Sequence, residues 1–256
     1  MTRALARTNF HSSQLIRTLA DLAVLQMSEP TAAFGEKLGL WIGFTDAIAL
    51  TGVHNSSADE KASVAQTMAD TPLDETFAKM RAQLESTIIK SHAANIGRTR
   101  AELTLPKLDA PLDDVKAYAP FRRYHQAHQR DMEASVRSLR TKLRDGVAKA
   151  SPKLRQLVAL DAAFDSILTE REGRLLATIP SLLEKRFNHL RKAYVQTLTD
   201  AQRTNDNPDL WMKPGAWLAR FCTELQAVLL AELDLRLQPA VGLLEALHHE
   251  KILQPV

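Results

Sequence analysis

The sequence predicts an all-α protein, a multi-helix bundle of long amphipathic helices with no sheet. Apolar residues recur at three- and four-residue steps through most of the 256 residues, which is the spacing that places them on one side of an α-helix. The alternation of apolar and polar residues that marks a half-buried strand is nowhere sustained. Only nine glycines are present, and none forms a hairpin turn between two alternating segments.

Helix start and stop signals divide the first 96 residues into three helical segments. One of the two serines at 12–13 is placed to cap the first helix. The Ser-Glu-Pro sequence at 28–30 marks the start of a second helix, which is expected to stop near Gly52. The Thr-Pro pair at 71–72 begins a third helix.

The second half of the chain is predicted to be mostly helical from about residue 120 to residue 200. The Ser-Pro pair at 151–152 combines a capping serine with a proline in the first turn, and therefore predicts a helix start. Pro180 is expected to kink or restart a helix. A final long helix is predicted over 216–237, and Pro239 is expected to break it before a short last helix.

Residues 97–115 are predicted to be a linker between two helical subdomains, residues 1–96 and residues 116–256. The linker contains two prolines and no regular apolar period, which is typical of a domain boundary. A chain of 256 residues is also long enough to form one continuous domain, which is the alternative.

Composition indicates a cytoplasmic protein without membrane insertion. The single cysteine, Cys222, cannot form an internal disulfide and suits a reducing compartment. The most apolar run, residues 217–233, is interrupted by one arginine and two glutamates, so it falls short of the ~20 apolar residues of a membrane span. The N-terminal residues lack the apolar stretch of a signal peptide.

Charge is distributed unevenly along the chain. Residues 116–149 carry nine Lys or Arg against three Asp or Glu, a net charge of +6. Residues 1–70 carry five against seven, and residues 206–256 carry four against seven, so both ends are acidic. The middle of the chain is therefore expected to present a surface that attracts an anionic partner.

The basic segment, residues 121–146, is predicted to be a two-faced helix. At ~100° per residue, His125 falls within an apolar stripe that faces other helices, and His128 falls at its edge. Arginines recur every seven residues on the far side, and Arg122 and Arg140 lie at the border of the stripe. We call this predicted set the arginine ridge: Arg123, Arg130, Arg137, Arg144 and, at the border, Arg140.

The arginine ridge predicts a binding surface for one of two anionic partners. Arginine pairs bidentately with phosphates, which follow one another regularly along double-stranded DNA. An acidic surface of a partner protein is the second possibility, and a solvated charged face is the alternative without a function. No aromatic residues lie between the arginines, which argues against base stacking and favours contacts to the DNA backbone alone.

Metal binding and catalysis are weakly supported. His125, His128 and Asp131 offer ligand types for a metal, but packing between helices is favoured for both histidines. Asp161 and Asp165 are four apart and share a helix face, and a solvated carboxylate pair is the favoured interpretation. Cys222 lies among apolar residues and is interpreted as core.

No phosphate-binding glycine loop, zinc-protease motif or GxSxG elbow is present. We therefore predict a protein that is not an enzyme and that uses neither a cofactor nor a metal.

Four segments together resemble a known family: RTNFHSSQLIRTLADLAV, GEKLGLWIGFTDAIAL, SPKLRQLVALDAAF and ELDLRLQPAVGLLEAL. They are similar to a helical proteobacterial family, ZorF-like, that is associated with type III Zorya anti-phage defence and encoded beside stator-like and OmpA-like membrane proteins. The resemblance implies a cytosolic defence component that works with other proteins of the same operon, downstream of a membrane motor. It brings no catalytic residues to this chain.

These observations predict a non-enzymatic component of a stator-like defence system that binds DNA backbone, or recruits a partner, through the arginine ridge. The alternative is a helical adaptor that binds an acidic partner protein. Self-association is also expected, because long amphipathic helices readily pair.

Overall fold

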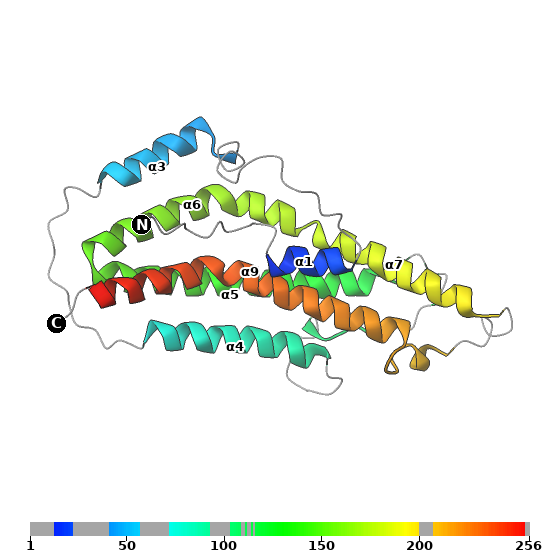
Figure 1. The fold of residues 1–256 in the computed structure, drawn as a ribbon. Helices are drawn as coiled ribbons and strands as arrows, with labels where there is room; N and C mark the ends of the chain where they lie inside the picture. Colours follow the sequence, from blue (N-terminus) through cyan, green and yellow to red (C-terminus); the bar gives the residue numbers. More distant parts are fainter. Residues whose placement is uncertain are drawn as a thin grey trace, which may run out of the picture. The chain divides into compact units, whose positions relative to one another are not determined.

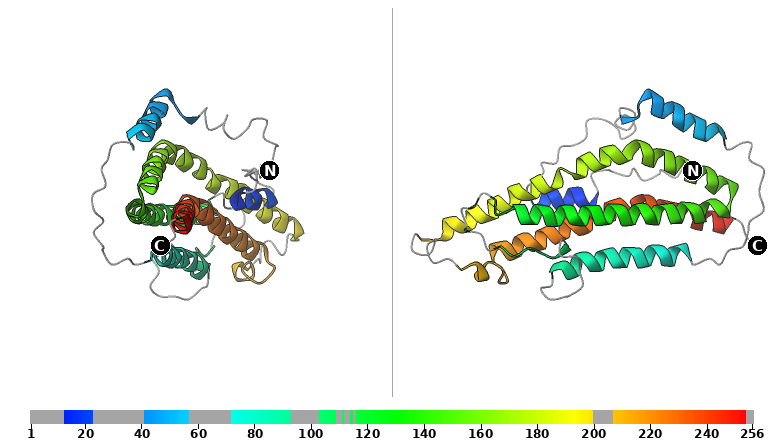
Figure 2. Two further views of the ribbon diagram at one scale, coloured as in Figure 1. Left: turned by 60° about the vertical axis from the view of Figure 1, so that its left-hand side comes forward. Right: turned by 180° about the vertical axis from the view of Figure 1, so that it is seen from behind.

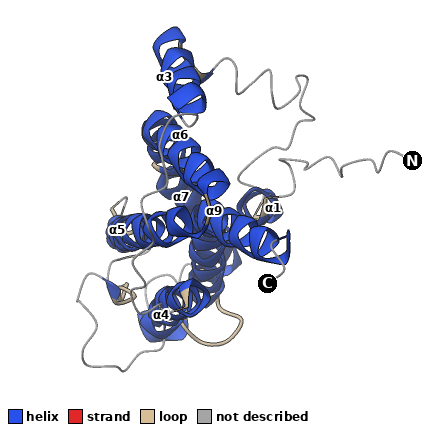
Figure 3. Ribbon diagram, turned by 90° about the vertical axis from the view of Figure 1, so that its left-hand side faces the viewer, coloured by secondary structure: helices blue, strands red, loops and turns tan. Residues whose placement is uncertain are grey.

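A computed structural model describes residues 13–22, 41–56, 72–92, 103–108, 111, 114, 116–199 and 207–253 of the chain. Within these ranges every regular element is helical, as Figure 3 shows, and the all-α prediction is confirmed. The helices, labelled in Figure 1 apart from η3, are α1 (Gln14–Asp21), α3 (Phe44–Ser56), α4 (Leu73–His92), α5 (Ala119–Ala150), α6 (Pro152–Leu176), α7 (Ile179–Thr197), η3 (Pro208–Leu210) and α9 (Trp217–Leu253).

Several helix boundaries agree with the start signals in the sequence. Helix α1 begins directly after Ser13, although the serine side chain makes no capping hydrogen bond. Ser151 caps α6, and its Oγ accepts a hydrogen bond from the backbone N–H of Leu154 at 3.2 Å. Pro180 restarts the chain as a helix in the first turn of α7, where its missing N–H costs nothing.

Two predicted helix ends are wrong. The second helix was expected to stop near Gly52, but α3 runs through this glycine to Ser56. It begins only at Phe44, and the Asp46 carboxylate accepts a hydrogen bond from the Gly43 N–H at 2.9 Å, which stabilises this start. The signal at residues 28–30 lies outside the described residues.

Helix α9 continues through Pro239, where a break was predicted. A proline inside a helix costs about 3 kcal/mol, because a hydrogen bond is lost and the ring crowds the preceding turn. Buried residues follow the proline at helical spacing, namely Ala240, Leu243 and Leu247. Their burial offsets that cost, since each buried leucine contributes about 1.5–3 kcal/mol.

The described helices divide into two compact units, each assembled from separate stretches of the chain. Unit 1 comprises Met1–Glu29, Glu85–Arg130 and Thr178–Leu235, and unit 2 comprises Pro30–Leu84, Asp131–Ala177 and Arg236–Val256. This partition differs from the sequence-based division into residues 1–96 and 116–256, because residues 97–115 lie within unit 1. Local sequence signals do not reveal such an interleaved arrangement.

An aromatic cluster forms the core of unit 1. The Phe187 ring on α7 lies 5.6 Å from the rings of both Tyr118 and Phe121, 5.3 Å from Trp217 and 5.1 Å from Phe221, measured between centroids. All five side chains are buried. Edge-to-face and tilted contacts of this kind add to the stabilisation from burial, so a protein with few aromatic residues uses several of them here to hold α5, α7 and α9 together.

A bidentate ion pair joins α7 to α9 in the same unit. The Arg186 guanidinium donates to both carboxylate oxygens of Glu224, at 2.8 and 2.6 Å, and Arg220 donates to the same carboxylate at 3.0 Å. Burial by itself would raise the pKa of Glu224, but the hydrogen bonds from Arg186 and Arg220 outweigh it and lower this pKa.

The lowered pKa of Glu224 predicts a pH-dependent contribution to stability. The contribution is present above the ordinary pKa of 4.5 and is lost as the pH falls through the lower pKa of the folded protein. Glu224→Gln is therefore expected to lower the free energy of unfolding by about 2 kcal/mol at neutral pH. This difference between the wild type and the variant is expected to shrink in acid. Thermal unfolding of both proteins across a pH series measures the difference; a difference that stays constant into strong acid contradicts the assignment.

Leucines and valines form the core of unit 2. Helices α5 and α6 are joined there by the tight turn at Ser151, and Leu139, Leu143 and Val147 of α5 are fully buried. Helix α3 lies alongside α6, as the views in Figure 2 show. The Phe44 side chain of α3 is 84% exposed.

Candidate functional site on helix α5

The apolar stripe of α5 lies where the sequence places it. Its predicted members are all buried: Phe121, Met132, Val136, Leu139, Leu143 and Val147. His125 and His128 are buried as well, which confirms that they pack between helices. In the arginine ridge, Arg123, Arg130 and Arg137 are exposed, whereas Arg140 and Arg144 are half-buried.

His125 lies beside a buried carboxylate of α9. Its Nε2 is 3.6 Å from an oxygen of Glu232, and both side chains are inaccessible to solvent. The side-chain amide of Gln129 donates to each Glu232 oxygen at 3.1 Å. Among the described residues, no group of three or more His, Cys, Asp or Glu side chains is positioned to hold a metal ion.

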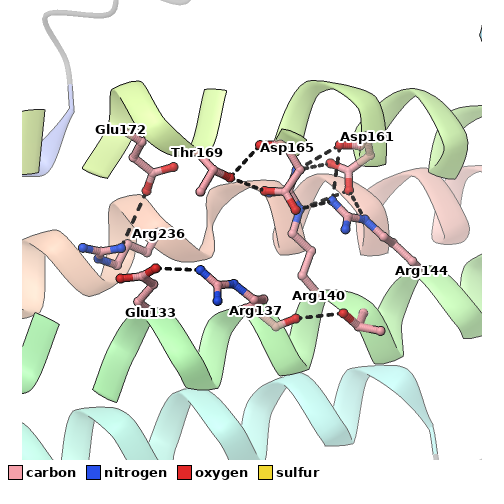
Figure 4. Close-up of polar contacts among 10 residues, drawn as sticks. Glu133, Arg137, Arg140, Arg144, Asp161, Asp165, Thr169, Glu172 and Arg236 are labelled. Carbon is pink, nitrogen blue, oxygen red and sulfur yellow. Dashed lines mark hydrogen bonds and ion pairs between the residues drawn. The ribbon is translucent and has the colours of Figure 1, made fainter. Parts of the chain in front are cut away.

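Arg140 and Arg144 form an ion-pair cluster with two aspartates of α6, which Figure 4 shows. Arg140 Nε lies 3.0 Å from Asp161 Oδ2, and Arg140 Nη1 lies 2.6 Å from Asp165 Oδ1. Arg144 Nε lies 2.6 Å from Asp161 Oδ2, and its Nη2 lies 3.0 Å from Asp165 Oδ2. Each arginine therefore bridges both carboxylates.

The cluster is largely removed from water. The side chains of Arg140 and Asp161 are 13% and 15% exposed. Asp165 is 31% exposed, but each of its carboxylate oxygens is paired with an arginine. The prediction that Asp161 and Asp165 form a solvated pair is therefore wrong. Because their guanidinium groups are engaged within unit 2, Arg140 and Arg144 hold α5 against α6.

The geometry of a helical hairpin explains this cluster. Helices α5 and α6 meet at Ser151, so residues at similar distances before and after the turn lie opposite each other. Two arginines four apart on one helix and two aspartates four apart on the other then form two matched pairs on facing turns. Matching the spacing of opposite charges on both sides of the Ser-Pro turn would have identified the cluster from the sequence.

Arg137 makes a different kind of contact. Its Nη2 lies 2.6 Å from the Glu133 carboxylate one turn earlier, and the two side chains are 64% and 51% exposed. Residues four apart on a helix are neighbours on its surface, so this is a local pair within α5. An exposed pair of this spacing contributes only about 0.3–0.5 kcal/mol, so Arg137 is held weakly.

Arg123 and Arg130 are exposed on the part of α5 that belongs to unit 1. This part, residues 119–130, contains no aspartate or glutamate. The neighbouring Arg122 is half-buried and pairs with Glu184 of α7. Arg123 and Arg130 are thus the exposed basic side chains on this part of α5.

Cys222 does not have the properties of a nucleophile. It is buried in α9, and burial raises the pKa of its thiol to about 12. The thiol is therefore protonated at neutral pH, whereas the thiolate is the reactive form. Its interpretation as a core residue is confirmed.

The fold and the site define the class of this protein as an all-α helical bundle with a basic helix whose charges are partly engaged inside the fold. The chain belongs to the DUF3348 family, described as a protein of unknown function, whose family model matches residues 1–249. No curated protein and no solved structure matches the chain. Within the described ranges, no helix combines the length and the apolar character needed to cross a membrane.

Proposed function

We propose that this chain is a non-enzymatic, cytoplasmic component of a stator-like anti-phage defence system, and that it binds the backbone of double-stranded DNA through Arg123 and Arg130. The DNA-binding part of the proposal rests mainly on one observation: Arg123 and Arg130 are both exposed on the same stretch of α5. The defence role rests on the resemblance of the four sequence segments. Phosphate contacts of this kind position a protein on DNA without reading its sequence. Other proteins of the same operon are its expected partners.

The surroundings of these arginines favour a phosphate backbone over an acidic protein surface. Protein interfaces are usually centred on buried apolar or aromatic anchors. The exposed large apolar side chains of the described residues lie elsewhere, and residues 119–130 contribute none of them. A phosphate backbone needs no such anchor, because counterion release supplies most of the binding free energy.

The remaining members of the arginine ridge have smaller roles in this proposal. Arg140 and Arg144 are assigned to the fold, because their donors are engaged by Asp161 and Asp165. Arg137 forms an ion pair with Glu133 and is therefore expected to add little to DNA affinity.

Charge reversal at Arg123 and Arg130 tests the proposal. The double variant Arg123→Glu/Arg130→Glu is expected to bind a DNA duplex about 10- to 100-fold more weakly at low salt, because two phosphate contacts are lost. Fluorescence anisotropy at about 50 mM and about 200 mM salt measures both the affinity and its salt dependence.

Lys142 and Lys149 provide a matched control on the same helix. They are exposed and also seven residues apart, so Lys142→Glu/Lys149→Glu makes the same change in charge in unit 2. This control is expected to keep most of the duplex affinity. If the wild type and the Arg123→Glu/Arg130→Glu variant bind the duplex equally well, the proposal is wrong. If the wild type does not bind the duplex, and the variant fails to pull down an operon protein that the wild type retains, the partner is an acidic protein and not DNA.

A further inference from the structure

Helix α7 carries a second row of basic side chains in unit 1. Lys185, His189 and Lys192 are exposed, and their spacing of four and three residues places them on one face of the helix. The opposite face is buried through Leu183 and Phe187. The only acidic residue of α7 is Glu184, and its carboxylate is engaged by Arg122.

Helices α5 and α7 pack side by side and run in opposite directions. The Asp114 carbonyl just before α5 accepts a hydrogen bond from Arg191 at 2.6 Å. Further along α5, Phe121 packs against Phe187, and Arg122 pairs with Glu184. The contacts move backwards along α7 as they move forwards along α5, which defines an antiparallel pair.

The antiparallel arrangement brings both basic rows to the same side of the pair. Arg123 follows Arg122 by ~100° around α5, and Lys185 follows Glu184 by ~100° around α7. In right-handed helices that run in opposite directions, these two rotations turn away from the Arg122–Glu184 contact towards the same side. Arg123 and Lys185 therefore emerge on one surface of unit 1.

The two rows follow each other along that surface. Counted residue by residue from the Arg122–Glu184 pair, Lys185 lies opposite the first turn of α5, and His189 and Lys192 lie progressively beyond its N-terminal end. Arg130 lies in the other direction. At ~1.5 Å per residue, the line from Arg130 to Lys192 is about 25 Å long. Large exposed apolar side chains are absent from α7 as described, as they are from residues 119–130. Asp114 is the half-buried carboxylate at the Lys192 end.

We infer that Lys185, His189 and Lys192 form a second segment of the phosphate-binding surface, so that α5 and α7 contact one duplex together along a continuous basic line. This inference rests on the proposed function. A ring N–H of His189 donates a hydrogen bond to a phosphate oxygen, and the two lysines supply point charges. Arg186 and Arg191 take no part, since Glu224 and the Asp114 carbonyl engage them.

The double variant Lys185→Glu/Lys192→Glu tests this inference. Its duplex affinity at low salt is expected to fall at least about tenfold, and the slope of log affinity against log salt concentration is expected to be shallower by about two. Both lysines are exposed, so the unfolding midpoint is expected to stay at the wild-type value. The neutral variant Lys185→Gln/Lys192→Gln is measured alongside, so that a folding defect in the charge-reversed protein cannot hide the result.

Two comparisons separate this inference from the function on which it rests. If Arg123→Glu/Arg130→Glu loses affinity for the duplex and neither α7 variant does (the glutamate or the glutamine substitutions of Lys185 and Lys192), α7 is outside the site and the proposed function stands. If the wild type itself does not bind the duplex, both are overturned. The matched pair Lys142→Glu/Lys149→Glu is the control, and an equal loss of affinity in this control contradicts a surface restricted to α5 and α7 of unit 1.

Discussion

Replacing Asp161 and Asp165 with asparagine is expected to lower the free energy of unfolding by about 3 kcal/mol. The change leaves the guanidinium groups of Arg140 and Arg144 largely buried without a carboxylate. Removing one partner of a buried ion pair is costly because the remaining charge stays away from water. Urea denaturation of the wild type and the double variant measures the difference.

A surface ion pair on the same helix provides the control. Arg174 pairs with Glu170 at the usual helical spacing, but both side chains are 75% exposed. Glu170→Gln is therefore expected to change the free energy of unfolding by less than about 0.5 kcal/mol. If the variant with asparagine at positions 161 and 165 is as stable as this control, the buried cluster stabilises the fold no more than an exposed ion pair does.

Phe187→Ala is expected to lower the free energy of unfolding by about 4 kcal/mol. The ring is fully buried and contacts four other aromatic rings, one from the turn before α5, one from α5 and two from α9. Its removal leaves a cavity and also eliminates those aromatic contacts. Thermal or urea unfolding measures the loss.

Phe44 allows the same substitution at a solvent-exposed site. Its side chain is 84% exposed on α3, so Phe44→Ala is expected to stay within about 0.5 kcal/mol of the wild type. A similar loss in both variants would mean that Phe187 is not the centre of the unit 1 core.

The helical class and the apolar stripe of α5 could be predicted from the sequence because both depend on local periodicity. The start of α6 at Ser151 could be predicted for the same reason, since a cap is a local interaction. The continuation of α9 through Pro239 depends on tertiary packing, which overrides local propensity.

The candidate site could be predicted only in part. The sequence identifies the seven-residue spacing of the arginines, but it treats Arg123 and Arg144 as equivalent. Their environments differ because α6 places Asp161 against Arg144, whereas residues 119–130 contain no carboxylate. Lys185 and Lys192 were missed because their relation to α5 depends on the antiparallel packing of α7 in unit 1.

The arginine ridge is assigned partly to DNA binding and partly to the fold, and the most direct test of this assignment compares two pairs of arginines in one duplex-binding experiment. The temperature is kept below the unfolding midpoints of all the proteins compared. Arg123→Gln/Arg130→Gln is expected to lose about tenfold or more in affinity at low salt, with an unchanged unfolding midpoint. Arg140→Gln/Arg144→Gln is expected to keep the wild-type affinity, and its free energy of unfolding is expected to be lower by about 3 kcal/mol. Equal losses of affinity in the two variants, or a loss confined to Arg140→Gln/Arg144→Gln, would contradict the assignment of Arg123 and Arg130 to binding and of Arg140 and Arg144 to the fold.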